Sequence, residues 1–392
     1  MSSKSFEGLG ISHAVSKALA GEGITAPFAI QALVVPDVLA GRDVLAKSPT
    51  GSGKTLAFAA PIVDRIDATA PRPAALVLAP TRELAAQIVD EARPLAAASS
   101  LSVSSVYGGV GLHAQAKRAR RAHLVVATPG RLLDLLDRGE LALDRVRVLV
   151  LDEADRMLDM GFRPDVDRIV SATPRDRQTL FFSATLDGEV GRLADRYTRS
   201  ARSHEHSPPA SRPRIEHRFI GVSREGKLDA VVRELRETEG GRALVFVRTK
   251  RGADRLVKRL RNQGLETLAM HGNKSQPQRQ KALAALDAGR IDALVATDVA
   301  ARGIDVAGIT HVINFDPPGD RHSYVHRVGR TARAGASGVG VTLVLGEQVS
   351  DVAAIAGELG LRHELRRRGP DGRSRERPHQ RAHRPGARRR RR

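Results

Sequence analysis

The stretch Lys47-Ser48-Pro49-Thr50-Gly51-Ser52-Gly53-Lys54-Thr55 constrains the fold of this chain more than any other segment. It follows an apolar run at 44–46 and precedes an apolar segment at 56–60, an order that predicts a strand, a glycine-rich turn and a helix. The two glycines let the backbone coil so that several N–H groups converge at the start of the helix. We therefore expect a phosphate-binding loop, in which Lys54 reaches the β- and γ-phosphates of a nucleotide and the Thr55 hydroxyl coordinates Mg²⁺.

The loop departs from the strict pattern at one position, because Ser48 stands where a glycine is usual. Taken alone, it is also compatible with an ordinary glycine-rich turn. Runs typical of strands alternate with amphipathic patterns typical of helices, for example at 82–93 and 130–136, with a last helix at about 349–359. The expected strands are 44–46, 75–79, 124–128, 146–151, 179–183, 243–247, 266–269, 293–297, 311–314 and 339–345. This βαβ order predicts parallel sheets covered by helices on both faces and favours the phosphate loop.

A polar stretch at 198–214, rich in Ser, His, Arg and Pro, interrupts this alternation. We therefore expect two α/β domains, at 1–200 and 215–360, joined by a linker at 201–214. Residues 361–392 are expected to form a disordered basic tail.

The net charge of +20 is distributed unevenly along the 392 residues. The tail contains fourteen arginines against Glu364, Asp371 and Glu376, a net charge of +11, so the other 360 residues carry only +9. Such a charge favours a polyanionic partner, with nucleic acid ahead of an anionic membrane surface. We expect the tail to attract phosphates by charge alone.

The composition excludes several classes of protein. The chain has no cysteine, which rules out disulfides and thiolate metal sites. No apolar run approaches the roughly 18 residues that span a membrane, and the first residues lack the apolar stretch of a signal peptide. We therefore expect a cytoplasmic protein with no membrane partner.

A second strong signal is the apolar strand at 148–151, which is followed at once by Asp152 and Glu153. Carboxylates that follow a strand lie at the carboxyl edge of a parallel sheet, where α/β folds bind ligands. Asp152 suits Mg²⁺, and Glu153 suits the orientation or deprotonation of an attacking water. A solvated acidic turn is the alternative, and the phosphate loop upstream in the same predicted sheet disfavours it.

The string Asp152-Glu153-Ala154-Asp155 resembles the motif that names the DEAD-box RNA helicases, and other motifs follow in family order over roughly residues 6–345. They are Gly23–Gln31 (Q motif, with Phe6 as the upstream aromatic), Ser48–Thr55 (motif I), Pro80–Leu84, Gly108–Gly109 and Thr128–Arg131 (RNA contacts), Ser183–Thr185 (motif III), Val245–Lys250 (motif IV), Gln276 and Arg279 (QxxR), Ala296–Asp305 (motif V) and His326–Arg333 (motif VI). The run His271–Gln276 also resembles the bacterial RhlE-like subgroup.

This resemblance implies two RecA-like domains that bind ATP and Mg²⁺ in the cleft between them. The residues it places at the nucleotide are Phe6, Ile24, Gln31, Ser48, Thr50, Gly51, Ser52, Gly53, Lys54, Thr55, Gly303 and Asp305. Gln31 is expected to hydrogen-bond the adenine edge, with a loop cap as the alternative. The family commonly has an adenine-stacking aromatic where this chain has Ile24, so its preference for adenine is expected to be looser.

Catalysis is assigned by the same resemblance to residues of both domains. Lys54, Asp152 and Glu153 act from the first domain, and Arg330 and Arg333 act as arginine fingers from the second. Since the two arginines are three residues apart, we expect them on one helix face, reaching the γ-phosphate when the domains close. Contact with RNA phosphates is the alternative. Coupling between the domains is expected from Asp155, Ser183, Thr185 and His326.

The RNA partner is expected to lie across both domains. The residues implied are Thr81, Arg82, Gly109, Thr128, Gly130 and Arg131 in the first domain and Thr249, Lys250, Gly272 and Thr297 in the second. Glycines and threonines approach the sugar-phosphate backbone without reading bases, and aromatic residues make up only 3% of the chain, so little sequence specificity is expected.

The function implied is ATP-dependent, local and non-processive RNA unwinding or ribonucleoprotein remodelling. An ATP-gated RNA clamp with little unwinding is the alternative, and a DNA helicase or translocase on the same fold is a third reading. Ribonucleoprotein or RNA-decay partners fit this function, and the tail is expected to tether the protein to RNA.

Overall fold

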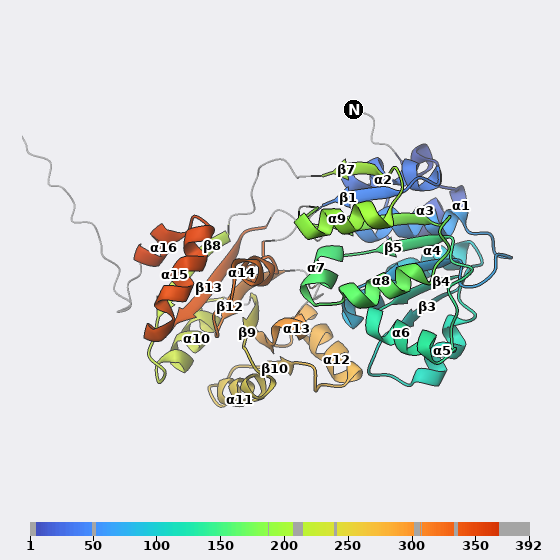
Figure 1. The fold of residues 1–392 in the computed structure, drawn as a ribbon. Helices are drawn as coiled ribbons and strands as arrows, with labels where there is room; N and C mark the ends of the chain where they lie inside the picture. Colours follow the sequence, from blue (N-terminus) through green and yellow to red (C-terminus); the bar gives the residue numbers. More distant parts are fainter. Residues whose placement is uncertain are drawn as a thin grey trace, which may run out of the picture.

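The computed structural model describes residues 5–48, 52–186, 188–206, 215–238, 241–301, 306, 308–332 and 336–367. Two α/β domains lie side by side, each built on one parallel sheet (Figure 1). The expected pair of parallel-sheet domains is confirmed.

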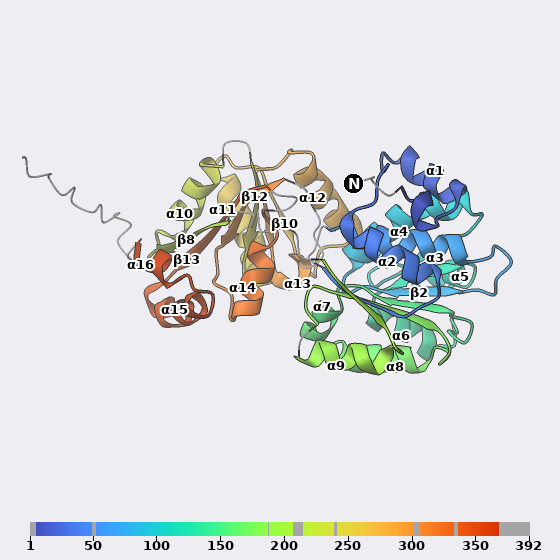
Figure 2. The same cartoon turned by 90° about the horizontal axis from the view of Figure 1, so that it is seen from above.

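The first domain has a seven-stranded sheet in the order β3-β4-β2-β5-β6-β1-β7. Its strands are β1 Val44–Lys47, β2 Ala75–Leu78, β3 Val103–Val106, β4 Leu124–Ala127, β5 Val148–Leu151, β6 Gln178–Ser183 and β7 Arg202–Glu205. Its helices are η1 Glu7–Leu9, α1 His13–Gly21, α2 Ala29–Leu39, α3 Lys54–Arg65, α4 Arg82–Ala98, α5 Leu112–Ala119, α6 Pro129–Asp137, α7 Ala154–Asp159, α8 Arg163–Ser171 and α9 Gly188–Tyr197. Figure 2 shows α2, α3 and α4 on one face of this sheet and α6, α8 and α9 on the other. Each face buries its own apolar cluster, as a parallel sheet requires.

The second domain has a six-stranded sheet in the order β10-β11-β9-β12-β13-β8. Its strands are β8 Ile215–Gly221, β9 Arg242–Phe246, β10 Thr267–Met270, β11 Ala293–Ala296, β12 Ile309–Asn314 and β13 Gly338–Val344. Its helices are α10 Lys227–Arg236, α11 Lys250–Arg261, α12 Gln276–Asp287, α13 Asp298–Ala301, α14 Arg321–Val328, η2 Gly346–Gln348, α15 Val349–Glu358 and α16 Arg362–Arg367. Helices α10 and α11 pack on one face, and α12 to α15 pack on the other.

The linker boundary is corrected by β7, which pairs in parallel with β1. Residues 202–205, placed by the sequence in the linker, therefore belong to the first sheet. The strand has the sequence Arg-Ser-His-Glu and lies at the sheet edge, so it lacks an apolar pattern. The other two described strands absent from the expected set, β3 and β8, are also edge strands that contain polar residues. Residues 207–214 of the predicted linker lie outside the described residues.

The boundary of the tail also changes. Residues 362–367 form α16, although the sequence placed them in the disordered tail. Leu361 and Leu365 pack against the apolar cluster of the second domain, which explains why the chain stays folded past Gly360. The rest of the tail, from residue 368, lies outside the described residues.

No helix in the described part of the chain is long and apolar enough to cross a membrane.

Candidate nucleotide and RNA site

The phosphate loop follows β1 at the carboxyl edge of the first sheet, as the sequence predicted. The Lys54 side chain is buried, and its Nζ donates a hydrogen bond of 2.9 Å to the Ser48 carbonyl across the loop. The Ser48 and Ser52 hydroxyls lie 2.5 Å apart. Thr55 is in the first turn of α3, and its hydroxyl has no hydrogen-bond partner among the described residues. Thr50 and Gly51 lie outside the described residues.

Gly53 precedes α3 in the left-handed region, with φ at +83°. A Cβ at this position would lie 2.5 Å from Phe28 Cδ2 and 2.6 Å from Gln31 Nε2. Both the backbone conformation and the close neighbours therefore require glycine.

Gln31 connects the start of α2 to the phosphate loop. Its Nε2 donates a hydrogen bond of 2.9 Å to the Gly53 carbonyl, and its Oε1 accepts one of 2.7 Å from the Phe28 N–H. The loop-cap alternative is therefore seen in the structure, while the adenine contact stays a prediction. Phe6 is buried and Ile24 is half-buried, and both pack in the apolar cluster that holds α1 against α3.

Asp152 follows β5 and is 2% exposed. Burial raises its pKa to about 7, and the positive charge of Lys54 acts in the opposite direction. A buried carboxylate needs a cation or hydrogen bonds to stay charged. Together with the free Thr55 hydroxyl, it forms an all-oxygen donor pair of the kind that Mg²⁺ prefers, so these residues fit this ion.

Glu153 has a positive φ of 50°, which is uncommon for a residue with a side chain. Its Oε2 accepts a hydrogen bond of 2.5 Å from Arg156 in the next turn. The left-handed turn directs the chain from β5 into α7 and holds Glu153 at the sheet edge beside Asp152.

Three neighbouring strands are joined behind these carboxylates. Asp155 accepts a hydrogen bond of 3.1 Å from the Ala184 N–H, which follows β6. The Ser183 hydroxyl accepts one of 3.3 Å from the Thr185 N–H, and the Ser183 carbonyl accepts one of 3.0 Å from the Ser48 N–H of the phosphate loop. The acidic motif is thus linked to the phosphate loop through the end of β6.

The second domain faces this edge through its helix α14. His326 Nδ1 lies 3.8 Å from Asp159 Oδ2 in the first domain. Burial, followed by the positive charge of Arg156, lowers the pKa of His326. His326 is therefore at the contact between the domains, as expected.

Arg330 is buried, and its Nε donates a hydrogen bond of 3.2 Å to the His326 carbonyl. The expectation that Arg330 and Arg333 share one helix face is wrong. Helix α14 ends at Val328, and Ala332 has a positive φ of 57°, so the chain leaves the helix before Arg330. Gly303, Asp305 and Arg333 lie outside the described residues.

A cavity of about 380 Å³ opens between the domains. Its lining includes Thr81, Arg82, Thr128, Gly130 and Arg131 from the first domain and Gly272 and Arg279 from the second. The structure thus brings together most of the residues expected to contact RNA. Gly109 lies against the Arg82 guanidinium, where a Cβ would collide with it.

The remaining predicted RNA residues lie beside the cavity or inside the domain. Thr249 caps α11, with its hydroxyl accepting a hydrogen bond of 2.9 Å from the Gly252 N–H. Lys250 packs beside Gly272 and donates a hydrogen bond of 2.9 Å to Asn273. Thr297 is 8% exposed at the start of α13, so the structure places it less openly than the sequence implied.

The cavity is cationic and is bridged by an ion pair. Arg279 Nε lies 2.7 Å from Glu83 Oε1, and both side chains are buried between α12 and α4. Burial, followed by the charge of Arg279, lowers the pKa of Arg82. The guanidinium groups of Arg82, Arg131 and Arg279 line the cavity together with the carboxylates of Glu83 and Asp134, a net charge of +1. Arg131 Nε lies 3.6 Å from Asp134 Oδ2.

Sequence reasoning missed several residues at these sites. Gln276 belongs to a motif that was recognised, but the structure adds that it is buried with no partner for either amide atom among the described residues. Glu83 lies within the recognised motif Pro80–Leu84 but was given no role there, because its role depends on a residue in the other domain. Phe28 could have been noticed, since an aromatic residue is unusual at a helix N-cap.

Comparison with known proteins agrees with this geometry. Residues 28–193 match the family DEAD/DEAH box helicase, and residues 226–335 match the helicase conserved C-terminal domain. The chain is 41% identical to the DEAD-box ATP-dependent RNA helicase CshA of Geobacillus kaustophilus, over 88% of this chain and 75% of that protein. It is 44% identical to the ATP-dependent RNA helicase DeaD of Mycobacterium tuberculosis, over 90% of this chain and 63% of that protein.

Solved structures give the same result. A structure of S. cerevisiae Dbp5 bound to RNA and ADP BeF3 superposes with a TM-score of 0.81 at 29% identity, covering 91% of this chain and 94% of that one. A structure of Mss116p bound to ssRNA and AMP-PNP gives 0.78 at 27% identity, covering 90% and 77%. These relatives do not distinguish the RhlE-like subgroup, which stays a prediction.

Proposed function

The chain belongs to the DEAD-box ATP-dependent RNA helicases, and on this premise we propose how its residues divide the work of RNA unwinding. The observation that carries the proposal is the cationic cavity, whose walls come from both domains. RNA held there contacts the two domains at once, so its binding favours the closed arrangement. Closure in turn brings the second domain to the nucleotide site.

ATP binds at the phosphate loop, with the loop N–H groups and Lys54 gripping its phosphates. Thr55 and Asp152 would hold Mg²⁺, which would supply positive charge beside the phosphates. Asp152, whose pKa is raised to about 7 by burial, would be kept in its charged form beside such a cation. Gln31 and Phe28 lie beside Gly53, where the base side of the nucleotide is expected.

Hydrolysis requires residues of both domains. Glu153 orients the attacking water, and Arg330 and Arg333 compensate the charge that develops on the γ-phosphate. The burial of Arg330 beside His326, which contacts the first domain, supports this role for Arg330. The acidic motif is connected to the phosphate loop through Asp155, Ser183 and Thr185. Through these hydrogen bonds, closure of the domains is coupled to the nucleotide site.

RNA is held mainly through its backbone. Arg82 and Arg131 supply guanidinium groups, while Gly109, Gly130 and Gly272 allow close approach of the chain. Strand separation follows if the closed cavity accepts one strand in a shape that cannot remain paired. The protein then separates short duplexes locally, without long translocation, in the cytoplasm and with ribonucleoprotein or RNA-decay partners.

The test is duplex unwinding by the wild-type chain and by Glu153→Gln. We expect the wild type to separate a short RNA duplex with ATP, and the variant to bind ATP and RNA tightly while hydrolysing slowly. A wild type that binds RNA with ATP but never separates strands would instead indicate a clamp.

A further inference from the structure

The outer face of helix α11 carries a line of positive charge. The helix buries its apolar side, formed by Ala253, Leu256, Val257 and Leu260, in the second domain. On the exposed side, Arg251, Arg255 and Lys258 follow one another at intervals of four and three residues, so they lie in one stripe. Arg259 is exposed beside this stripe.

These four side chains have no neutralising partner in the part of the chain that the structure describes. Within the described ranges, none of them forms an ion pair or side-chain hydrogen bond. The acidic residue of this helix, Asp254, is already engaged by His271 Nε2 at 3.0 Å and Lys274 Nζ at 2.8 Å. Arginines four residues apart on a helix repel each other, so the pattern destabilises α11 unless an anion lies along it.

Some other exposed helical arginines of this chain are paired, whereas Arg118, Arg192, Arg233 and Arg321 have no ion pair among the described residues. Arg138 lies 2.7 Å from Asp134 in α6, and Arg168 of α8 lies 2.7 Å from Asp137. What distinguishes α11 among the described helices is that four unpaired basic side chains lie together on it.

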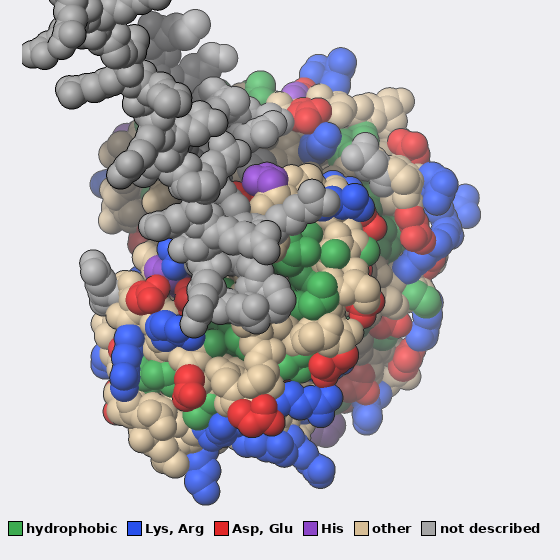
Figure 3. Space-filling model, turned by 90° about the vertical axis from the view of Figure 1, so that its left-hand side faces the viewer, with side chains coloured by type: hydrophobic (Ala, Val, Ile, Leu, Met, Phe, Trp, Pro, Cys, Tyr) green, Lys and Arg blue, Asp and Glu red, His purple; other side chains and the backbone are tan. Residues whose placement is uncertain are grey.

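The stripe begins beside the cavity between the domains. Lys250, the first residue of α11, packs on Gly272, which lines the cavity. From Arg251 to Arg259 the helix rises about 12 Å at 1.5 Å per residue, so the charge extends well past the cavity. Figure 3 shows Lys and Arg side chains gathered along the lower edge of the second domain, the side on which Figure 1 places α11.

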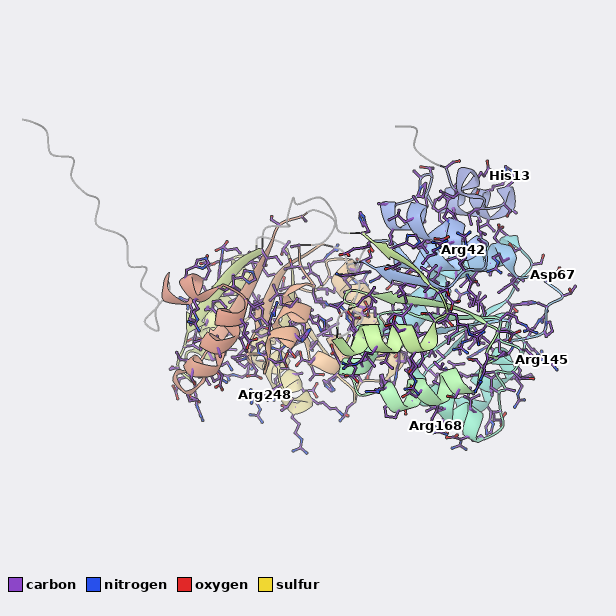
Figure 4. All side chains as sticks on the ribbon, turned by 45° about the horizontal axis from the view of Figure 1, so that its top comes forward. His13, Arg42, Asp67, Arg145, Arg168 and Arg248 are labelled. Atoms are coloured by element: carbon purple, nitrogen blue, oxygen red, sulfur yellow. The ribbon has the colours of Figure 1, made fainter. Side chains whose placement is uncertain are left out.

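We propose that the outer face of α11 binds the phosphate backbone of RNA that flanks the segment held in the cavity. The inference rests on the proposed function, since it extends the same RNA path. Arginine groups suit phosphate oxygens, and the stripe contains no aromatic residue on which a base could stack, so binding along α11 is independent of sequence. Arg248 is exposed just before α11 and extends the positive charge beyond the N-terminus of this helix (Figure 4).

The test compares a short oligouridylate that fills only the cavity with the same oligonucleotide extended at both ends. The full chain is compared with Arg251→Gln/Arg255→Gln/Lys258→Gln/Arg259→Gln. We expect the affinity of the variant for the extended RNA to fall roughly tenfold or more, and its salt dependence to weaken by about 0.7 for each phosphate that the variant no longer binds. ATP hydrolysis stimulated by the short RNA should stay at the wild-type level.

The matched control is Arg138→Gln/Arg145→Gln/Arg147→Gln/Arg168→Gln, which removes the same charge from the first domain. Figure 4 shows Arg145 and Arg168 there, away from Arg248. Equal decreases in affinity in the two variants would show that only net charge matters and would overturn the proposal. Unchanged affinity of the α11 variant for the extended RNA would also overturn it, and an acidic protein would then be the better candidate for this surface. A wild type whose hydrolysis is not stimulated by the short RNA would instead contradict the proposed function. The double variant Arg255→Gln/Arg259→Gln gives the same comparison if the quadruple variant folds poorly.

Discussion

Phe28 is the most unusual residue at the nucleotide site. It is 62% exposed, yet its ring lies against Gly53 beside the buried amide of Gln31. An exposed aromatic ring next to a nucleotide site offers the π-face that Ile24 lacks. We therefore expect Phe28 to stack on the base of ATP.

Changing Phe28→Ser tests this role without weakening the helix, because serine is a favourable N-cap. We expect the Kd for ATP to rise about fivefold to a hundredfold, the range that removal of one base-stacking ring gives. Titration with a fluorescent ATP analogue measures it. The control is Leu33→Ser, an exposed apolar residue on the same helix that should leave the Kd unchanged. Equal effects of the two changes would exclude stacking.

Asp152 makes stability depend on pH. Its native pKa is about 7 and the ordinary value is 3.8, so between these values the native state holds a proton that the unfolded state has lost. The contribution of Asp152 to the stability of the nucleotide-free protein therefore falls as pH rises from about 4 to 7, and stays low above that. The Asp152→Asn variant has no carboxylate at this position, so it does not show this loss of stability. Its amide oxygen can still accept the hydrogen bond from the Glu153 N–H.

We expect the Tm of nucleotide-free Asp152→Asn at pH 8 to exceed that of the wild type by at least roughly 2–4 °C, the shift that 1 kcal/mol gives in a domain of this size. The difference should shrink toward pH 4. Mg²⁺ and ATP should raise the wild-type Tm and have little effect on the variant. A wild type more stable than the variant at pH 8 without ligand would contradict the assignment.

At the scale of elements, helices α4 and α12 hold the domains together through Glu83 and Arg279. Glu83→Gln leaves Arg279 in the cavity but removes the charge that pairs with it. Breaking a buried pair costs about 3–5 kcal/mol. Here the closed state is destabilised relative to the open state, because opening exposes both groups to water. RNA affinity with a non-hydrolysable ATP analogue should fall at least roughly tenfold, while ATP binding without RNA is unchanged.

Asp137→Asn is the matched control, since it breaks an exposed pair with Arg168 by the same change in charge. Exposed pairs contribute roughly 0–1 kcal/mol, so this variant should bind RNA as the wild type does. If Glu83→Gln also binds RNA normally, the pair does not stabilise closure.

Helix α16 sets where the folded second domain ends. A chain ending after Gly360 lacks Leu361 and Leu365, which pack on the apolar cluster, whereas one ending after Arg367 keeps them. We expect the shorter chain to be less stable by roughly 1–3 kcal/mol, because two partly buried leucines are removed. Denaturant unfolding of both chains measures the difference, and identical midpoints would show that α16 adds no stability.

At the scale of the whole molecule, the sequence predicted the elements that short apolar patterns and turn residues encode. The phosphate loop, the strand before Asp152 and the strands with apolar runs lie where they were expected, because periodicity and turn chemistry encode them. The polar edge strand β7 was missed because its pairing with β1, not its composition, makes it a strand. The Glu83–Arg279 pair and the cavity depend on how two domains meet, which no local pattern records.

We propose that RNA and ATP are bound by both domains at once, so that RNA switches on hydrolysis. The most direct test is the rate of ATP hydrolysis by the full chain without nucleic acid, with single-stranded RNA, and with DNA of the same sequence. We expect slow hydrolysis without nucleic acid and strong stimulation by RNA only. A rate that is equally fast without RNA, or equally stimulated by DNA, would contradict it.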